Sequence, residues 1–175
     1  MTERNFLQSC CRGLVNVIVL ISLAWFLVFG FFSQLSMSGH SMEPCLYSGD
    51  TVMLDTLSYH FLSPGRMDVV AFQRADGNVS VKRVVGLPGE TVTIRNGHIY
   101  IDGTLLETDK ISEISLSGLA ENPVTLMENE YFLIGDNADS SEDSRFQNVG
   151  NVRSSQILGR VWLRVFPFGR FGLIH

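Results

Sequence analysis

Charged residues are absent from Gly13 to Met42, a stretch without Asp, Glu, Lys or Arg near the start of a chain of 175 residues. Within it, Leu14 to Phe32 forms a run of 19 mostly apolar residues, which is long enough to cross a bilayer core of about 30 Å as a helix. A cleaved secretory signal has a shorter apolar region, about 7–15 residues, followed by small residues. This run instead ends in the bulky sequence FLVFGFF. The missing charge therefore predicts a membrane anchor at residues 14–32.

Basic charge flanks the apolar run on its N-terminal side. Arg4 and Arg12 precede the run, and the first charged residues after it are Glu43 and Asp50. Because Lys and Arg accumulate on the cytoplasmic side of a membrane, residues 1–13 are predicted to be cytoplasmic. The rest of the chain, residues 33–175, would then form an extracytoplasmic domain at the plasma membrane.

The chain as a whole has little basic charge and few cysteines. A net charge of −5 provides no basic stripe, which excludes a nucleic-acid partner held by phosphate neutralisation. Cys10 and Cys11 precede the predicted anchor and Cys45 follows it, so the outer domain is expected to fold without an internal disulfide. Cys10 and Cys11 are interpreted as reduced thiols, with acylation beside the membrane as the alternative.

Clustered metal ligands and a phosphate-binding loop are also missing from the sequence. The four histidines stand apart at positions 40, 60, 98 and 175. The acidic segment GDNADSSEDSR lacks the spacing and the central glycine of a calcium loop. The segment GLPGE lacks the Lys-Ser or Lys-Thr pair that closes a phosphate-binding loop. We therefore expect no metal and no cofactor.

The chain after residue 50 contains a series of β-type segments. The clearest is TVTIRNGHIYIDGTLL, in which the central Asn-Gly pair suits a two-residue type I′ turn. That turn pairs Ile94 with Ile99 and Val92 with Ile101, so four apolar side chains share one face. A mainly β fold is predicted, with one N-terminal transmembrane helix, an all-β domain, and residues 105–130 as a variable connection. Further β-rich segments are residues 68–73, 79–85, 131–134 and 158–166.

Ser41, in the segment MSGHSMEP just past the apolar run, is the candidate nucleophile. A serine nucleophile needs a base within hydrogen-bond reach. Among the histidines, His40 is adjacent and would point away from Ser41, and His60 alone is not dismissed by its position. Lys82 is the other candidate, because it lies in VSVKRVV and burial among valines favours the neutral amine.

The neighbouring Arg83 would point to the opposite, water-exposed face of the same strand. Alternatively, Lys82 is exposed and Arg83 points inward, or both side chains snorkel.

Four segments occur together in the order and approximate spacing found in type I signal peptidases. The segments are SGHSMEP with SGDTVML close behind, PGRMDVVAF, VKRVVGLPGE and GDNADSSEDSR. The chain resembles this family from the predicted anchor to its C-terminus. The resemblance implies an all-β signal-peptidase-like domain with a Ser/Lys dyad, which removes signal peptides from exported preproteins. In it, Ser41 matches the nucleophile of the S-M-x-P motif and Lys82 matches the general base of K-R-V-x-G.

The resemblance also implies roles for residues around the dyad. The backbone N–H of Ser41 would be one oxyanion donor. The second donor is open, because many family members carry a serine where this chain has Gly39; Ser38 and a main-chain N–H are both candidates. The residues that match supporting positions are Ser141, which orients the lysine, Asp143 and Arg145, which form an ion pair, and Asp136 and Asn137, which shape their loop.

The substrate is expected to bind as a strand added to exposed sheet edges. Family members select small residues one and three positions before the cut. Two methionines near the nucleophile could also form an apolar surface that enters lipid, with core packing as the alternative. The residues expected to contact the substrate are Met37, Ser38, Met42 and Val81.

Two further positions depart from the family pattern without touching the dyad. Cys45 stands where a threonine is usual, and Ala138 stands where Arg or Lys often follows Gly-Asp-Asn. Two other interpretations of the chain stay open: a dedicated processing peptidase for one exported substrate, of conjugation or pilus type, and a non-catalytic membrane-anchored assembly module. The expected partners are the signal peptides of preproteins and the lipid bilayer.

Overall fold

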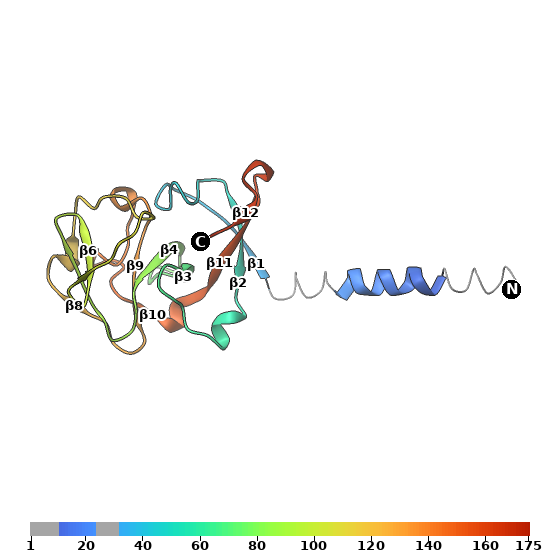
Figure 1. Ribbon diagram of the computed structural model, residues 1–175, viewed down its shortest axis with the longest axis horizontal. Helices are drawn as coiled ribbons and strands as arrows, with labels where there is room; N and C mark the ends of the chain where they lie inside the picture. Colours follow the sequence, from blue (N-terminus) through green and yellow to red (C-terminus); the bar gives the residue numbers. More distant parts are fainter. Residues whose placement is uncertain (1–10, 24–31) are drawn as a thin grey trace, which may run out of the picture.

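The computed structural model describes residues 11–23 and 32–175 of the chain (Figure 1). Residues 11–23 form a helix, and the first strand begins at Phe32. Within these two ranges, no helix has both the length and the apolar character needed to cross a membrane. The predicted anchor, residues 14–32, includes residues 24–31, which lie outside the described residues, as does Cys10.

An antiparallel eight-stranded sheet forms the larger part of the domain. Its strand order is β1-β2-β11-β3-β4-β9-β10, and β12 pairs with β11. The strand β1, through which the chain enters the domain, lies at one edge of this sheet. The strands are β1 (Phe32–Ser36), β2 (Thr51–Asp55), β3 (Val69–Gln73), β4 (Val79–Gly86), β9 (Glu130–Ile134), β10 (Val152–Arg153), β11 (Ile157–Phe166) and β12 (Gly172–Leu173).

A second, four-stranded sheet has the order β7-β6-β5-β8 and lies at the far end of the domain from β1 (Figure 1). The pairing of Val92 with Ile101 and of Ile94 with Ile99 confirms the predicted hairpin. Its two turn residues have φ values of +51° and +78°, and a type I′ turn requires positive φ at both. The strands are β5 (Thr91–Arg95), β6 (His98–Ile101), β7 (Thr104–Leu105) and β8 (Val124–Thr125).

The connection at residues 105–130 is packed against this smaller sheet. Ile114, Ala120 and Leu126 are buried in one apolar cluster with the β5 and β6 side chains. A loop held by three buried apolar side chains has a defined path, even though it carries little regular structure. The short 3-10 helices of the described residues are η1 (Ser58–His60), η2 (Gly118–Glu121), η3 (Ala138–Ser140), η4 (Ser154–Gln156) and η5 (Phe168–Arg170).

Strand β4 is buried on both of its faces. Val81 belongs to an apolar cluster with β2 and β11 side chains, whereas Val84 belongs to a second cluster with Val70 and Leu133. The expectation that one face of this strand is wet was therefore wrong, and Arg83 is fully buried. The fold is mainly β, as predicted, and β4 runs through the middle of the larger sheet.

Candidate active site

The side chains of Ser41 and Lys82 are in direct contact, although one comes from the turn after β1 and the other from the central strand β4. Lys82 Nζ donates a hydrogen bond to Ser41 Oγ over 2.7 Å. Ser41 lies in a turn shortly after β1, and Lys82 lies in β4. Residues 41 positions apart in the sequence are thus held within the distance that proton transfer requires.

Burial changes the protonation of Lys82. Its side chain is 4% exposed, and this loss of hydration disfavours the ammonium form. Burial is the main cause that lowers the pKa of Lys82 from 10.5 to about 8, and the charge of Arg74 acts in the same direction, while Asp143 and Glu142 oppose it. A substantial fraction of neutral amine is therefore present near pH 8.

Arg83, the neighbour of Lys82, is buried as a charged group. Its Nε donates to Asp136 Oδ1 over 2.7 Å and its Nη2 donates to Asp136 Oδ2 over 2.6 Å. Its Nη1 donates to the carbonyl oxygen of Met67 over 2.8 Å. The two-pronged pairing satisfies the guanidinium, which explains how this face of β4 is dry while Arg83 stays ionised. Asp136 therefore lies on the face of β4 opposite to Lys82, where it pairs with Arg83.

The loop after β9 packs directly on the backbone of Ser41. The Asn137 N–H donates to the Ser41 carbonyl oxygen over 3.0 Å. A Cβ added to Gly135 would lie 2.5 Å from that same oxygen and closer still to Ser141 Oγ. The chain therefore needs a glycine at this point, because no other side chain fits between the two serines. Sequence reasoning did not single out Gly135, although it is the first residue of the GDN motif.

A buried network around Asp143 supports the same loop. The carboxylate accepts hydrogen bonds from Arg145 Nε over 2.8 Å and Nη2 over 2.9 Å, from Ser141 Oγ over 2.7 Å and from the Gly135 N–H over 3.1 Å. Arg145 and Asp143 thus form the expected ion pair. The expectation that Ser141 orients Lys82 differs from what is seen: among the described residues, the hydrogen bond of Lys82 Nζ is with Ser41.

A cavity of about 100 Å³ opens beside the dyad, with Ser41 and Lys82 in its wall. Met37, Ser38 and Val81, which were predicted to contact substrate, line it, whereas Gly39 does not. Gly39 is exposed, with a φ of +83° and no atom within 4 Å of an added Cβ.

Met42 was predicted to lie at this surface, and that placement was wrong. Its side chain is 1% exposed and packs in the apolar cluster with Leu46 and Val52. The turn that presents Ser41 to the cavity points the next side chain in the opposite direction, into the core. Core packing was the alternative interpretation for this methionine.

The residues that depart from the family pattern fit their surroundings. Ala138 is 1% exposed, and its backbone accepts from Arg145 Nη2 over 2.5 Å and donates to Ser112 Oγ over 2.9 Å. Cys45 is half-buried, and its carbonyl oxygen accepts from Arg164 Nη1 over 2.9 Å. Ala138 thus acts through its backbone, whereas Cys45 also places its thiol beside the buried pair of Arg83 and Asp136.

Among the histidine side chains that the structure describes, none hydrogen-bonds to Ser41 or Lys82. The Nδ1 of His40 lies 2.8 Å from Glu43 Oε1 in an exposed pair. His60 ends η1, and His98 begins β6. Within residues 11–23 and 32–175, no group of three or more His, Cys, Asp or Glu side chains is arranged to hold a metal ion.

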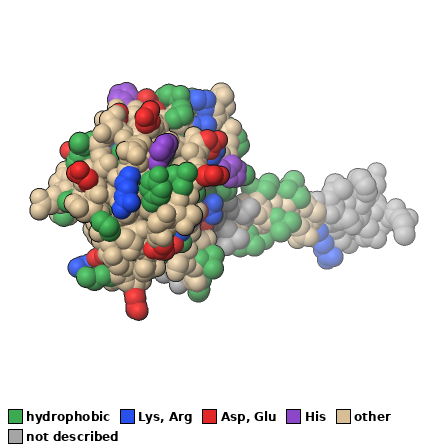
Figure 2. Space-filling model, turned by 60° about the vertical axis from the view of Figure 1, so that its left-hand side comes forward, with side chains coloured by type: hydrophobic (Ala, Val, Ile, Leu, Met, Phe, Trp, Pro, Cys, Tyr) green, Lys and Arg blue, Asp and Glu red, His purple; other side chains and the backbone are tan. Residues whose placement is uncertain are grey.

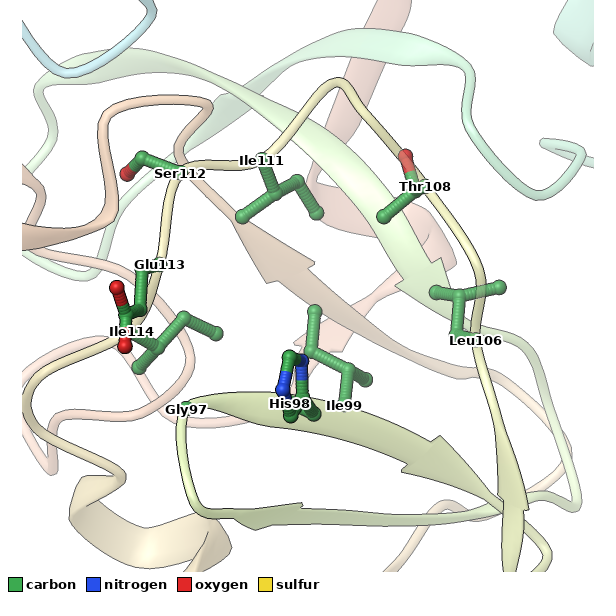
Figure 3. Close-up of a pocket in the computed structure, with 9 residues that line it drawn as sticks. All are labelled: Gly97, His98, Ile99, Leu106, Thr108, Ile111, Ser112, Glu113 and Ile114. Carbon is green, nitrogen blue, oxygen red and sulfur yellow. The ribbon is translucent and has the colours of Figure 1, made fainter.

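A second cavity, of about 330 Å³, lies between the β5–β6 hairpin and the loop of residues 106–114 (Figure 3). Neither Ser41 nor Lys82 lines it. His98 and Ile99 face it from the hairpin, and residues 106–114 form its other wall. Ser112 in that wall donates its N–H to the Asp136 carbonyl oxygen over 2.8 Å. The cavity is thus joined by one loop to the segment that packs on Ser41.

Comparison with known proteins gives a consistent result. Residues 11–166 match the family described as signal peptidase, peptidase S26. The chain is 31% identical over 141 residues to a probable signal peptidase I-2 of Synechocystis sp., covering 77% of this chain and 63% of that protein. It is 33% identical to signal peptidase I of Bacillus caldolyticus, covering 80% of this chain and 82% of that protein.

A solved structure also resembles part of the chain. A crystal structure of a signal peptidase I from Enterococcus faecalis V583 is 30% identical in sequence and aligns with a TM-score of 0.47. The alignment covers 57% of this chain and 97% of the solved one.

Proposed function

The chain belongs to the signal peptidase family, peptidase S26, and on this premise we propose that it is a membrane-anchored serine endopeptidase that removes signal peptides from exported preproteins. The observation that carries the proposal is the 2.7 Å contact between Ser41 Oγ and the buried amine of Lys82. A hydroxyl and a lysine with a pKa of about 8 form a nucleophile and a general base.

The reaction follows from this contact. Neutral Lys82 accepts the Ser41 proton as Oγ attacks the scissile carbonyl carbon, and the resulting ammonium then protonates the leaving amine. The acyl-enzyme forms as the peptide bond breaks. Lys82, neutral again, takes a proton from a water molecule that attacks the ester, and Ser41 is released with its hydroxyl restored.

The oxyanion needs donors that are not already in use. Among the described residues, the backbone N–H of Ser41 makes no hydrogen bond, so it can donate to the developing charge. Ser38 lines the same cavity as Ser41, and we assign its hydroxyl as the second donor. Ser38→Ala should then lower kcat by about 10²-fold with little change in KM, measured by steady-state cleavage.

The substrate would add as a strand between two free edges. Strand β4 pairs with β3 over residues 79–83 and with β9 only from Arg83 onward, which leaves residues 79–82 unpaired on one side. Strand β1 pairs with β2 alone. The cavity of about 100 Å³ between these edges suits small side chains next to the scissile bond.

Membrane attachment is supported by the N-terminal segment. The described helix carries exposed apolar side chains along its length (Figure 2), with Leu14 64%, Leu20 65% and Ile21 63% exposed. The 19-residue apolar run around it contains no charge and is long enough to span a bilayer. We propose that residues 14–32 form the anchor, residues 1–13 are cytoplasmic and residues 33–175 are the extracytoplasmic catalytic domain. An alkaline carbonate wash should leave the full chain in the membrane pellet.

Apolar loops flank the point where the chain enters the domain. Phe32 lies opposite Asp55 in the sheet, and in the loop that follows Asp55 Phe61 is 81% exposed and Leu62 67% exposed. The last segment, residues 157–175, also presents exposed aromatic side chains. Exposed aromatic and apolar side chains favour the membrane interface, which would hold the cavity close to emerging preproteins. The exposed aromatic side chains of the last segment are Phe166, Phe168 and Phe171.

The test is cleavage of a preprotein whose signal peptide ends in A-x-A by the full chain in detergent. Ser41→Ala and Lys82→Met should each reduce kcat/KM by about 10³-fold or more. Lys110→Met, an exposed change of the same kind, is the matched control and should retain full activity. Full activity of both dyad variants would refute the assignment.

The same assay separates the other interpretations. Cleavage of one preprotein among many would indicate a dedicated processing peptidase. An intact wild-type chain that cleaves none of them would favour a non-catalytic assembly module.

A further inference from the structure

Arg74 shares a face of the larger sheet with Lys82. In the β3–β4 hairpin, Val70 lies opposite Lys82 and Phe72 lies opposite Ser80. The Arg74 N–H donates to the Asn78 carbonyl oxygen over 2.8 Å, which continues the pairing. Because side chains alternate along a strand, Val70, Phe72 and Arg74 project to the same side as Lys82. The long side chain of Arg74 therefore starts on the face that holds the general base.

An ion pair fixes the charged end of Arg74 beside the catalytic loop. Arg74 Nη2 lies 3.0 Å from Glu142 Oε2. Glu142 stands between Ser141 and Asp143, both buried in the network that supports Ser41. The Arg74 side chain is 17% exposed and that of Glu142 is 62% exposed. The cation is thus the more buried member of the pair, and the anion is the more solvated one.

The guanidinium of Arg74 is held by two carboxylates at the edge of the active site. Its Nη2 is paired with Glu142, and its Nε forms an ion pair with Asp76 Oδ2 over 3.5 Å. Nε is nevertheless a buried donor without a hydrogen-bond partner within the described part of the chain, which costs some free energy. Stability alone does not explain this incomplete hydrogen bonding.

We propose that Arg74 and Glu142 are positioning residues that act through Lys82: their opposed charges set the pH range in which Lys82 accepts the Ser41 proton. The inference rests on the proposed function for its catalytic meaning. A cation near Lys82 disfavours a second positive charge, so Arg74 favours the neutral amine, and Glu142 has the opposite effect.

The other groups that face Lys82 leave room for this control. The Ser41 hydroxyl is neutral, Asp143 is paired with Arg145, and Asp136 is paired with Arg83. The charges of both aspartates still act on Lys82, with that of Asp143 the largest, and those of Arg74 and Glu142 act beside them. Both aspartates have buried arginine partners, so replacing either one would leave an unpaired charge in the core. The Arg74–Glu142 pair is more exposed, so a single substitution there can change the charge near Lys82 while the core stays intact.

The test titrates Lys82 directly in the full chain. The sequence has two lysines, Lys82 and Lys110, so protein labelled with ¹³Cε-lysine gives two signals that Lys110→Arg assigns. Arg74→Gln should raise the midpoint of the Lys82 titration, and Glu142→Gln should lower it, each by about 0.3–0.7 of a pH unit. The double variant should fall between the two single variants.

Two exposed residues elsewhere provide matched controls for net charge. Arg95→Gln in β5 and Glu128→Gln in the turn before β9 change the total charge by the same amounts and should leave the midpoint unchanged. Equal shifts in these controls would overturn the proposal, because net charge alone would then explain the result.

Cleavage assays distinguish this inference from the proposed function. The acidic limb of kcat/KM should move with the Lys82 midpoint, toward higher pH in Arg74→Gln and toward lower pH in Glu142→Gln. An active wild type whose variants lose rate equally at every pH would overturn the inference, since that pattern indicates a structural role. An inactive wild type with opposite titration shifts would instead refute the proposed function and leave the charge effect on Lys82 established.

Discussion

Replacing Lys82 by Met should stabilise the protein at neutral pH. The lysine side chain is 4% exposed, and burial lowers its pKa from 10.5 to about 8. The difference between these two values corresponds to about 3 kcal/mol of destabilisation when the amine is protonated, at about 1.4 kcal/mol for each pKa unit. Met is unbranched and apolar and carries no such cost.

The net gain is smaller, because the variant also loses a hydrogen bond. The contact of Lys82 with Ser41 is worth about 1 kcal/mol, so the free energy of unfolding should rise by about 2 kcal/mol at pH 7. For a domain of this size, that corresponds to an increase in Tm of about 4–8 °C. Lys110→Met, at an exposed position, should change Tm by no more than about 2 °C.

The sign of the pH dependence provides the refuting result. Between about pH 8 and pH 10.5 the unfolded chain binds more protons at Lys82 than the native protein does, so the wild type gains stability as pH rises through this window. The Tm advantage of Lys82→Met should therefore shrink through this window and reverse by about pH 10.5, where the charge cost is gone and the wild type keeps its hydrogen bond. A thermal unfolding series of both proteins from pH 7 to pH 11 measures it. A constant Tm difference across that range would refute the reasoning.

Three further substitutions test the loops around the dyad. Gly135→Ala should reduce cleavage by at least about 10²-fold while most of the protein stays folded, because the new Cβ would lie 2.5 Å from the Ser41 carbonyl oxygen; cleavage rate and circular dichroism check this together. Asp143→Asn should lower the free energy of unfolding by about 3–5 kcal/mol, because Arg145 is 1% exposed and would lose its carboxylate; an unchanged denaturation midpoint would contradict this. Gly39→Ser should leave kcat within about 2-fold of wild type, because Gly39 does not line the cavity that holds Ser38 and Ser41; its φ of +83° should cost about 1 kcal/mol of stability, and steady-state cleavage with thermal unfolding checks both.

The features that the sequence predicted well depend on short-range physics. The β5–β6 hairpin follows from one turn and the alternation of its flanking residues, and the observed register of Val92 with Ile101 confirms it. The burial of Lys82 follows from the valines beside it in β4. Each prediction used residues a few positions apart, where the geometry of a strand decides which side chains share a face.

The predictions that were wrong depend on partners distant in the sequence. Arg83 was expected to face water, yet Asp136, 53 residues further along the chain, pairs with it in the core. Met42 was expected at the surface, yet it packs on strands that become neighbours only when β11 joins β2. Neither outcome follows from local pattern, because each requires the order of strands in the sheet.

Strand β4 buries two adjacent cations, and their partners determine the opposite roles of the two side chains. Burial opposes the charge of Arg83, but the hydrogen bonds and charge of Asp136 outweigh it and hold the pKa of Arg83 above its ordinary value. Lys82 meets a neutral hydroxyl instead, and the carboxylate of Asp143 is held by Arg145, so burial prevails and the pKa falls. The charge of Asp143 acts on Lys82 and opposes this fall even though Asp143 is paired with Arg145, so burial is the effect that leaves Lys82 able to accept the Ser41 proton.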